Sequence, residues 1–147
     1  MLEIALYQPD IPQNTATILR LGACLGVTVN IIEPTGFIWS DKALRRAGMD
    51  YLDHARIVRH ASWDKFFAGS EAKRLVLATT AADTDYRDFR FSGDDIIIFG
   101  RESAGVPDAV RGSVKHHIAI AMQAGMRSLN IAMSCAMVTG EALRQLR

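Results

Sequence analysis

The sequence predicts an α/β protein, a mostly parallel sheet sandwiched by helices, and two observations carry this prediction. Short β-rich runs alternate with helical runs from the start of the chain, as in LEIALY (2–7) followed by NTATILRLGACLG (14–26). The later runs RLVLATT (74–80) and DIIIFG (95–100) contain no polar alternation. Strands of that kind are covered on both faces, which is typical of a parallel sheet between two layers of helices.

The same patterns predict the remaining elements. Three further strands are expected, at VTVNIIE (27–33), HARIV (54–58) and HHIAIAM (116–122). Four further helices are expected, over SDKALRRAG (40–48), over SWDKFFAG with Ser62 as its N-cap, after Pro107, and from about Ser128 to Gln145. Because no repeat or linker interrupts this order, one domain spanning 1–147 is predicted.

Composition fits such a domain and excludes few functions. Of the 147 residues 49% are hydrophobic, and the formal net charge of +1 neither indicates nor excludes a polyanionic partner. No apolar run approaches the roughly 18 residues of a membrane span, and Met1 is followed by a strand-like segment rather than a basic leader. The expectation is a soluble cytoplasmic protein.

Cysteine and histidine placement indicates neither a redox pair nor a metal site. Cys24 and Cys135 lie in apolar helical contexts, and both are expected to be buried thiols. Of the four histidines, two are neighbours that face opposite sides of a strand and two stand alone: His116 and His117, His54 and His60. We therefore expect no bound metal.

The last helix carries information about assembly. Nearly every position of LNIAMSCAMV (129–138) is apolar or small, so this stretch has no polar face. Such a helix is expected to be covered on two sides. The second cover is either another subunit, which favours a homodimer through the C-terminal helix, or further elements of the same chain around a central helix.

Three loops are candidates for one shared site, because ligands of a parallel sheet bind outside the carboxyl ends of its strands. In QPDIPQNTATILR (8–20) two prolines are expected to delay the helix and Asn14 to cap it. In FGRESAGVP (99–107) the glycines permit close backbone approach, and MQAGMRSLN (122–130) leads into the last helix. Taken singly, each loop is also compatible with an ordinary strand-to-helix connection.

Together the three loops resemble the motifs of the SPOUT class of knotted methyltransferases, and within it the TrmL or YibK-like group of tRNA 2′-O-methyltransferases. The resemblance rests on PQNTATILRLGACLG, IIFGRESAGVP and IAMQAGMRSLNIAMSCA in this order, with IIEPTGF and DKALRRAGMDY between the first two. It extends over essentially the whole chain. It implies a C-terminal trefoil knot, S-adenosyl-L-methionine (SAM) as cofactor, and tRNA as substrate, methylated in the anticodon region on the ribose of the wobble nucleotide, cytidine or modified uridine 34.

The resemblance also implies roles for particular residues. Those expected around SAM are Ala78, Thr79, Gly100, Ile120, Ala121, Met122, Ser128 and Leu129. Those expected at the catalytic centre are Arg20, Asn14, Glu102 and Asn130. Transfer of the methyl group to a 2′-hydroxyl needs no metal, only an in-line arrangement and removal of the hydroxyl proton. The resemblance implies that Arg20 is the base that removes the hydroxyl proton. A guanidinium is already protonated at ordinary pH, so it is better suited to stabilise the developing alkoxide or to bind a phosphate.

A basic surface is the predicted RNA-binding site. The cations expected to neutralise phosphates are Lys42, Arg45, Arg46 and Arg127, with Arg56 and Arg59 nearby. Phe37 or Trp39 would stack on a flipped base. The alternative for these cations is a solvated helix face. Since one copy of a chain this small offers little surface for an anticodon arm, a composite groove on a homodimer is expected.

Two positions depart from the pattern of the group. Ala16 stands where the first motif commonly has glycine, and Gly140 stands where the last helix often has tyrosine. Two other functions stay open: a SPOUT 2′-O-methyltransferase for another RNA site, and a catalytically silent RNA-binding or assembly module, which alanine in place of glycine at position 16 suggests.

Overall fold

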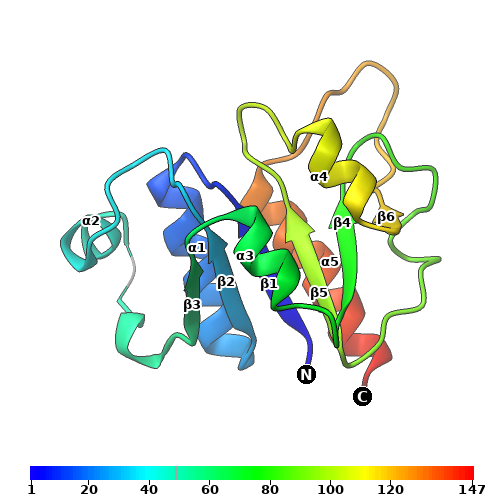
Figure 1. Cartoon of the computed structure of the whole chain (residues 1–147). Coiled ribbons are helices and arrows are strands. Elements are labelled where there is room, and N and C mark those ends of the chain that lie inside the picture. The colour runs from blue at the N-terminus through cyan, green and yellow to red at the C-terminus, as the bar shows by residue number, and fades with distance from the viewer. Residues whose placement is uncertain (49) are drawn as a thin grey trace.

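Six strands form one sheet in the computed structural model, which describes residues 1–48 and 50–147. The strand order is β3-β2-β1-β5-β4-β6, and all neighbouring strands run parallel (Figure 1). The strands are β1 (Glu3–Tyr7), β2 (Thr28–Ile32), β3 (Ile57–His60), β4 (Arg74–Ala78), β5 (Asp95–Phe99) and β6 (His116–Ile118). The predicted α/β class with a parallel sheet is confirmed.

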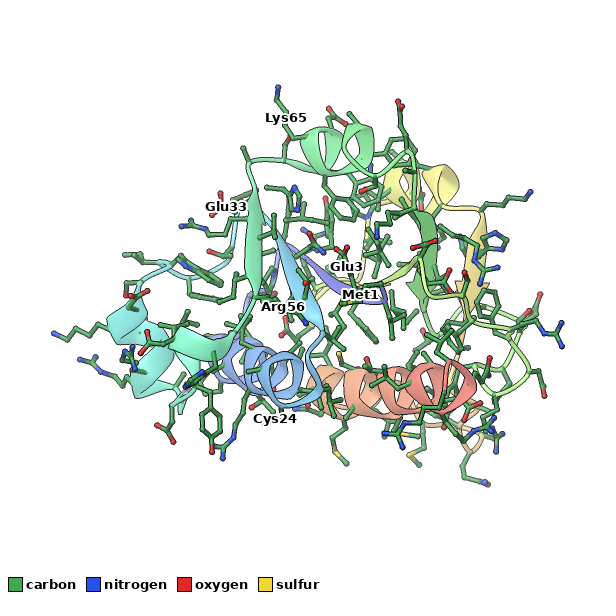
Figure 2. All side chains as sticks on the ribbon, turned by 90° about the horizontal axis from the view of Figure 1, so that it is seen from below. Met1, Glu3, Cys24, Glu33, Arg56 and Lys65 are labelled. Atoms are coloured by element: carbon green, nitrogen blue, oxygen red, sulfur yellow. The ribbon has the colours of Figure 1, made fainter. Side chains whose placement is uncertain are left out.

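Two layers of helices cover this sheet. The helices are α1 (Pro12–Leu25), α2 (Asp41–Arg46), η1 (Leu52–His54, a 3₁₀ helix), α3 (Trp63–Ala68), α4 (Asp108–Ser113) and α5 (Ile131–Gln145). Figure 2 shows α1 and α5 on one face and α3 and α4 on the other. The α2 helix contacts α1 and η1 and lies beyond the β3 side of the sheet in Figure 1. Within the described ranges no helix is both long and apolar enough to cross a membrane.

The central strand β5 shows why the sequence lacks polar alternation. All five of its residues are buried. Ile97 and Phe99 belong to the core beneath α1 and α5, while Ile96 and Ile98 belong to the core beneath α3 and α4. Because successive side chains of a strand point to opposite faces, a strand between two helical layers needs apolar residues on both faces, and residues 96–99 supply them. The predicted cover on both faces is confirmed.

The first helix begins earlier than predicted. Ile11 is its N-cap and Pro12 its first residue, where proline's missing N–H would have no partner in any case. The prolines therefore start the helix rather than delay it. The expectation that Asn14 caps the helix was wrong, because Asn14 lies inside the first turn. Ser62 does cap α3, with its hydroxyl accepting a hydrogen bond from the Lys65 amide, as predicted.

Two strand boundaries also differ from the predicted ones. β3 begins at Ile57 rather than at residue 54, because residues 52–54 form η1. β6 ends at Ile118 rather than at residue 122, because only Ala119 pairs further, through a single bridge to Asp85. The segment after Ala119 forms a loop.

The C-terminal segment runs between two parts of the chain that precede it. On one side Thr79 donates its amide to the Ile118 carbonyl at 2.9 Å. On the other side the backbone amide of Tyr86 donates to the Ala119 carbonyl at 2.8 Å, and the Ala119 amide donates to the Thr84 carbonyl at 2.9 Å. Residues 116–119 thus lie between β4 and the loop that leaves β4. This interleaving is compatible with the trefoil knot, which stays a prediction.

The two cysteines have different surroundings. Cys135 is buried in α5, and desolvation raises the pKa of its thiol to about 12. Cys24 is exposed, and Figure 2 shows it on the outer side of α1. The expectation of a buried Cys24 was wrong, because this position of α1 faces away from the sheet.

Among residues 1–48 and 50–147, neighbours cover the α5 helix on one side only. Its inner side, with Cys135, Val138 and Ala142, packs into the core. Its outer side exposes Met133 (60%) and Met137 (40%). The second cover expected from the sequence is therefore not supplied by the described residues of the same chain.

Candidate functional site

A cavity of about 650 Å³ opens at the carboxyl ends of β4, β5 and β6. Its wall includes the ends of these strands at Ala78, Phe99 and Ile118, together with the three loops that the sequence singles out. The volume lies within the roughly 300–1,000 Å³ of sites that bind small molecules. The geometry therefore identifies this cavity as the candidate ligand site.

Most of the predicted site residues meet at this cavity. Those in its wall are Asn14, Ala78, Thr79, Gly100, Glu102, Ile120, Met122, Arg127, Ser128, Leu129 and Asn130. Those outside its wall are Arg20, Lys42, Arg45, Arg46 and Ala121. The cavity thus gathers seven of the eight expected cofactor-binding residues, all but Ala121, and three of the four expected catalytic residues, all but Arg20.

A hydrogen bond joins the first loop to the third. The side-chain amide of Asn130 donates to Oδ1 of Asn14 at 3.0 Å. Asn130 is also the N-cap of α5, with its Oδ1 accepting from the amides of Ala132 (2.9 Å) and Met133 (3.4 Å). Because both oxygen and nitrogen of this one side chain are engaged, the start of α5 fixes the position of the start of α1.

The second loop is closed tightly on itself. Arg101 and Gly105 exchange two backbone hydrogen bonds of 3.0 and 2.9 Å, and Gly105 has a positive φ of 61°. A Cβ at Gly100 would lie 2.7 Å from the carbonyl carbon of Gly105, closer than real contacts allow. Glycine at both positions therefore permits the loop to fold back beside the end of β5.

Glu102 is half-buried in this loop and contacts Asp10 of the first loop. The Asp10 backbone amide donates to Oε2 of Glu102 at 3.2 Å, and the Ser103 hydroxyl donates to Oδ2 of Asp10. Burial, followed by the hydrogen bond with the Asp10 side chain, raises the pKa of Glu102 to about 7, although the Asp10 amide, by stabilising the ionised carboxylate, acts to lower it. The hydrogen bond with Glu102 lowers the pKa of Asp10. A carboxyl group that titrates near neutral pH therefore lines the cavity.

Arg20 lies on the exposed side of α1, outside the cavity. Its guanidinium is 4.8 Å from the ring centroid of Tyr51 and 3.9 Å from a carboxylate oxygen of Asp50. Both contacts come from the segment that follows α2. Arg20 thus contacts the segment that follows the basic helix α2 and does not line the cavity.

The predicted basic surface consists partly of paired cations. Lys42, Arg45 and Arg46 are exposed on α2, and Arg45 lies 3.3 Å from Asp53. Arg59 pairs with the Glu33 carboxylate. The remaining two predicted cations lie elsewhere: Arg56 donates to the carbonyl of Gly26, and Arg127 lies in the cavity wall. The predicted cations therefore do not form one continuous surface: three lie on α2, and Arg127 lies in the cavity wall.

The two aromatic residues expected to stack on a base stack on each other. The Phe37 and Trp39 rings are 6.2 Å apart at 22°, and both pack against the core. The Arg59 guanidinium lies 5.1 Å from the Trp39 ring. Ile38, between them, is 87% exposed, so the residue that this loop presents to solvent is aliphatic.

Two polar residues of this region are not among the residues predicted from the sequence. Asp10 follows β1 in QPDIP, and its position at the carboxyl end of a strand was the available signal. Arg111 on α4 lines the cavity, and its Nε is buried without a hydrogen-bond partner among the described residues. No pattern in the sequence points to Arg111.

The wall has the chemistry expected for SAM. Apolar side chains that suit an adenine ring include Leu77, Phe99, Ile118, Ile120 and Leu129. The wall also contains charged side chains of both signs, and these suit a ligand that carries an ammonium, a carboxylate and a sulfonium group. They are Glu102, Arg101, Arg111 and Arg127. In the part of the chain that the structure describes, no three His, Cys, Asp or Glu residues are grouped as metal ligands would be.

The comparisons with known proteins identify a family of methyltransferases and individual relatives. Residues 1–140 match the SpoU rRNA Methylase family. A tRNA (cytidine(34)-2′-O)-methyltransferase of Beijerinckia indica is 56% identical over 145 residues, which cover 97% of this chain and 91% of that protein. A solved structure described as "Structural insights into the 2-OH methylation of C/U34 on tRNA" has a TM-score of 0.94 at 35% identity, covering 99% of this chain and 96% of its own.

A further structural relative contains the expected cofactor. It is the SpoU methyltransferase AviRb of Streptomyces viridochromogenes in complex with AdoMet, with a TM-score of 0.87 and 25% identity. The match covers 99% of this chain and 60% of that one. The resemblance inferred from the three motifs is confirmed, and the chain belongs to the SpoU rRNA methylase family.

Proposed function

We propose that this chain is a SAM-dependent tRNA methyltransferase that modifies the ribose 2′-hydroxyl of nucleotide 34, a cytidine or a modified uridine. The observation that carries the proposal is the cavity in which Asn14 from the start of α1, Glu102 from the loop after β5 and Asn130 from the N-cap of α5 meet. A relative with 56% identity is named for this reaction.

The residues of the cavity divide into two groups by chemistry. When bound, SAM supplies the activated methyl group. The apolar wall at Phe99, Ile118 and Leu129 holds the adenosine and excludes water from it. The amides of Asn14 and Asn130, fixed by their mutual hydrogen bond, orient the 2′-hydroxyl. Catalysis in this arrangement comes from positioning and from removal of one proton.

Arg20 acts on the substrate from outside the cavity. Its guanidinium is permanently charged, and its exposed position beside Tyr51 suits a phosphate of the tRNA better than the reacting oxygen. The exposed cations Lys42, Arg45 and Arg46 of α2 extend the same surface. Binding of tRNA is therefore expected to weaken as salt rises.

The working form is a homodimer through α5. Met133 and Met137 on α5 and Leu25 at the end of α1 (44%) are exposed apolar residues on neighbouring helices. Figure 2 shows these two helices side by side in one layer. A two-fold partner would cover this face and would double the surface offered to an anticodon arm. With tRNA as substrate, the cytoplasm is the expected compartment.

The decisive test combines binding and product mapping. SAM and its demethylated product are titrated into the purified protein by calorimetry, and micromolar binding is expected. The protein is then incubated with radiolabelled SAM and unmodified or cellular tRNA, and the methylated nucleotide is mapped. A matched tRNA with 2′-deoxyribose at nucleotide 34 accepts no methyl group if the proposal is right, and equal labelling of both tRNAs would contradict it.

The dimer has its own test. Met133→Lys with Met137→Lys places two charges on the proposed interface and is expected to give monomers in a sizing experiment. Phe67→Lys is the matched control, because Phe67 is 42% exposed on α3, on the opposite face of the sheet. A doubly substituted protein that elutes as the unaltered protein does would exclude this interface.

A further inference from the structure

We propose that Glu102 accepts the proton of the 2′-hydroxyl and that Asp10 is a positioning residue for it, the two side chains forming one carboxyl pair. The inference rests on the proposed function, since it names the proton acceptor of that reaction. Three observations carry it: the contact between the two residues, the rigidity of their surroundings, and the place of Glu102 in the cavity.

The contact is direct. The Asp10 amide donates to Oε2 of Glu102 at 3.2 Å, although the two residues are 92 positions apart. Oδ2 of Asp10 accepts from the Ser103 hydroxyl. Oδ1 of Asp10 is buried and has no hydrogen-bond partner among the described residues. A buried carboxylate oxygen without a donor is costly, and a proton on Glu102 shared between the two carboxyl groups would satisfy the pair.

The neighbourhood holds Asp10 in place. A Cβ at Gly36 would lie 2.5 Å from Cβ of Asp10, so the loop after β2 packs directly on this side chain. The Gly36 amide also donates to the carbonyl of Pro9 at 2.9 Å. Asp10 is therefore confined between the loop of Gly36 and the loop of Ser103, and it cannot move away from Glu102 without displacing one of them.

The charged groups around the pair have defined positions. Arg101, next to Glu102, donates to the Gly105 carbonyl at 3.3 Å and lies 5.6 Å from the Tyr7 ring. Arg111 on α4 and Arg127 in the loop before α5 line the same cavity. Of the charged groups around Glu102, the Asp10 carboxylate raises the pKa of Glu102. The state of Glu102 thus depends on Asp10 more than on these three arginines.

Glu102 is better placed and better suited to take a proton than Arg20. It lines the cavity with Asn14 and Asn130, whereas Arg20 does not. An ionised carboxylate accepts a proton readily, and a guanidinium does not. In the proposed step the 2′-oxygen bonds to the methyl carbon, the carbon–sulfur bond breaks with its electron pair left on sulfur, and the hydroxyl proton passes to Glu102, from which it returns to solvent.

The first experiment measures single-turnover methyl transfer against pH, with saturating SAM and tRNA. The rate of methyl transfer by the unaltered protein is expected to rise with pH, over the range in which Glu102 loses its proton. Glu102→Gln is expected to lower the rate by about 10²–10⁴-fold and to remove this rise. Asp10→Asn removes the neighbouring negative charge and is expected to shift the rise by about one pH unit toward acid.

The control separates this effect from a general one. Asp94→Asn removes an exposed carboxylate near the N-terminus, 3.2 Å from the Met1 amino group, and is expected to leave the profile unchanged. A purely structural role of Asp10 would lower the rate or the melting temperature without moving the profile. An Asp10→Asn variant that binds SAM normally and keeps the original profile would overturn the proposal, as would full activity of Glu102→Gln.

A second readout needs neither SAM nor tRNA. The carboxyl carbon of Glu102 is followed by ¹³C NMR in protein with labelled glutamate, and its signal is assigned by its loss in Glu102→Gln. It is expected to titrate near neutral pH in the unaltered protein and at lower pH in Asp10→Asn. Titration of Glu102 in the ordinary acidic range would overturn the inference even if methyl transfer to tRNA is found. A protein that shows the expected titration but methylates no tRNA would instead contradict the proposed function alone.

Discussion

The side chain of Asn130 binds Asn14 at 3.0 Å across 116 positions of the chain. One residue thereby caps α5 and fixes the start of α1, so the helical layer beside the sheet and the wall of the cavity are set by the same contact. Substitutions at this position can separate the two roles.

Asn130→Ser is expected to preserve stability and to impair methyl transfer. Serine caps helices about as well as asparagine, but its side chain is too short to reach Asn14. Asn130→Ala loses the cap as well, at a cost of about 1 kcal/mol. Melting temperature and single-turnover rate are measured for both variants. Equal activity of Asn130→Ser and the unaltered protein would show that the contact between the two loops does not position the substrate.

Gly100→Ala is expected to abolish SAM binding. The new Cβ would lie 2.7 Å from backbone carbon of Gly105, so the loop must open and the wall of the cavity must change. Gly112→Ala on α4 is the matched control, because no atom lies within 4 Å of its new Cβ. Calorimetry with SAM distinguishes them, and undiminished affinity in Gly100→Ala would mean that the ligand binds elsewhere.

Arg20→Ala is expected to reduce the rate of methyl transfer about 10-fold or more, because a cation that binds a tRNA phosphate is lost. Its affinity for SAM is expected to stay within about twofold of that of the unaltered protein, because Arg20 does not line the cavity. Arg20→Lys keeps the charge, so a residue that binds a phosphate retains part of its tRNA affinity. Filter binding with tRNA and calorimetry with SAM are compared for both variants. Loss of SAM affinity in Arg20→Ala would contradict the position that the structure gives this residue.

Glu102→Gln is expected to stabilise the protein above neutral pH. The pKa of Glu102 is raised to about 7 from an ordinary value of 4.5, so the folded chain binds more protons than the unfolded chain between these values. The free energy of unfolding therefore falls as pH rises through this window. Because the side chain is half exposed, we discount the penalty to roughly 1 kcal/mol, or about 2–4 °C.

Melting temperatures of Glu102→Gln and the unaltered protein are compared at pH 5 and pH 8. The difference between the two proteins should be larger at pH 8. A constant difference would show that Glu102 has an ordinary acidity in the folded state.

Arg74→Met is expected to destabilise the protein by about 3–5 kcal/mol. Arg74 binds both carboxylate oxygens of Asp95, at 2.6 and 2.8 Å, and the Asp95 side chain is fully buried. Removing the cation leaves a buried charge without its partner. Arg144→Met, which breaks the exposed pair with Glu141, is expected to leave chemical denaturation unchanged. Similar denaturation midpoints for the two variants would contradict the expectation that the buried ion pair stabilises the fold more than the exposed one.

Local patterns were sufficient for the sheet but not for the first helix start. The apolar runs of β4 and β5 predicted buried parallel strands because their side chains meet helices on both faces. Asn14 was assigned as a cap because it is a preferred cap residue, yet Pro12 already supplies the geometry of a first turn. Local propensity does not decide between two adjacent start signals.

The departure at Ala16 is explained by the same helix. Ala16 lies within α1 and is 2% exposed. Alanine is favoured over glycine by about 1 kcal/mol in a helix interior, so this position requires no glycine. The substitution therefore gives no reason to favour a silent RNA-binding module.

The carboxyl pair lay beyond sequence prediction for a physical reason. Asp10 and Glu102 meet only because β1 and β5 are neighbours in the sheet and end at the same edge. Each residue alone resembles an ordinary loop acid. The burial of Glu102 and its hydrogen bond with the Asp10 side chain, which together raise the pKa of Glu102, depend on the topology that places β5 beside β1.

The most direct measurement is the position of the methyl group on tRNA treated with purified protein and SAM. Nuclease digestion and mass spectrometry are expected to find one methyl group, on the 2′-oxygen of nucleotide 34. A methyl group at another nucleotide or on a base, or tRNA left unmodified by a protein that binds SAM, would contradict the proposed function.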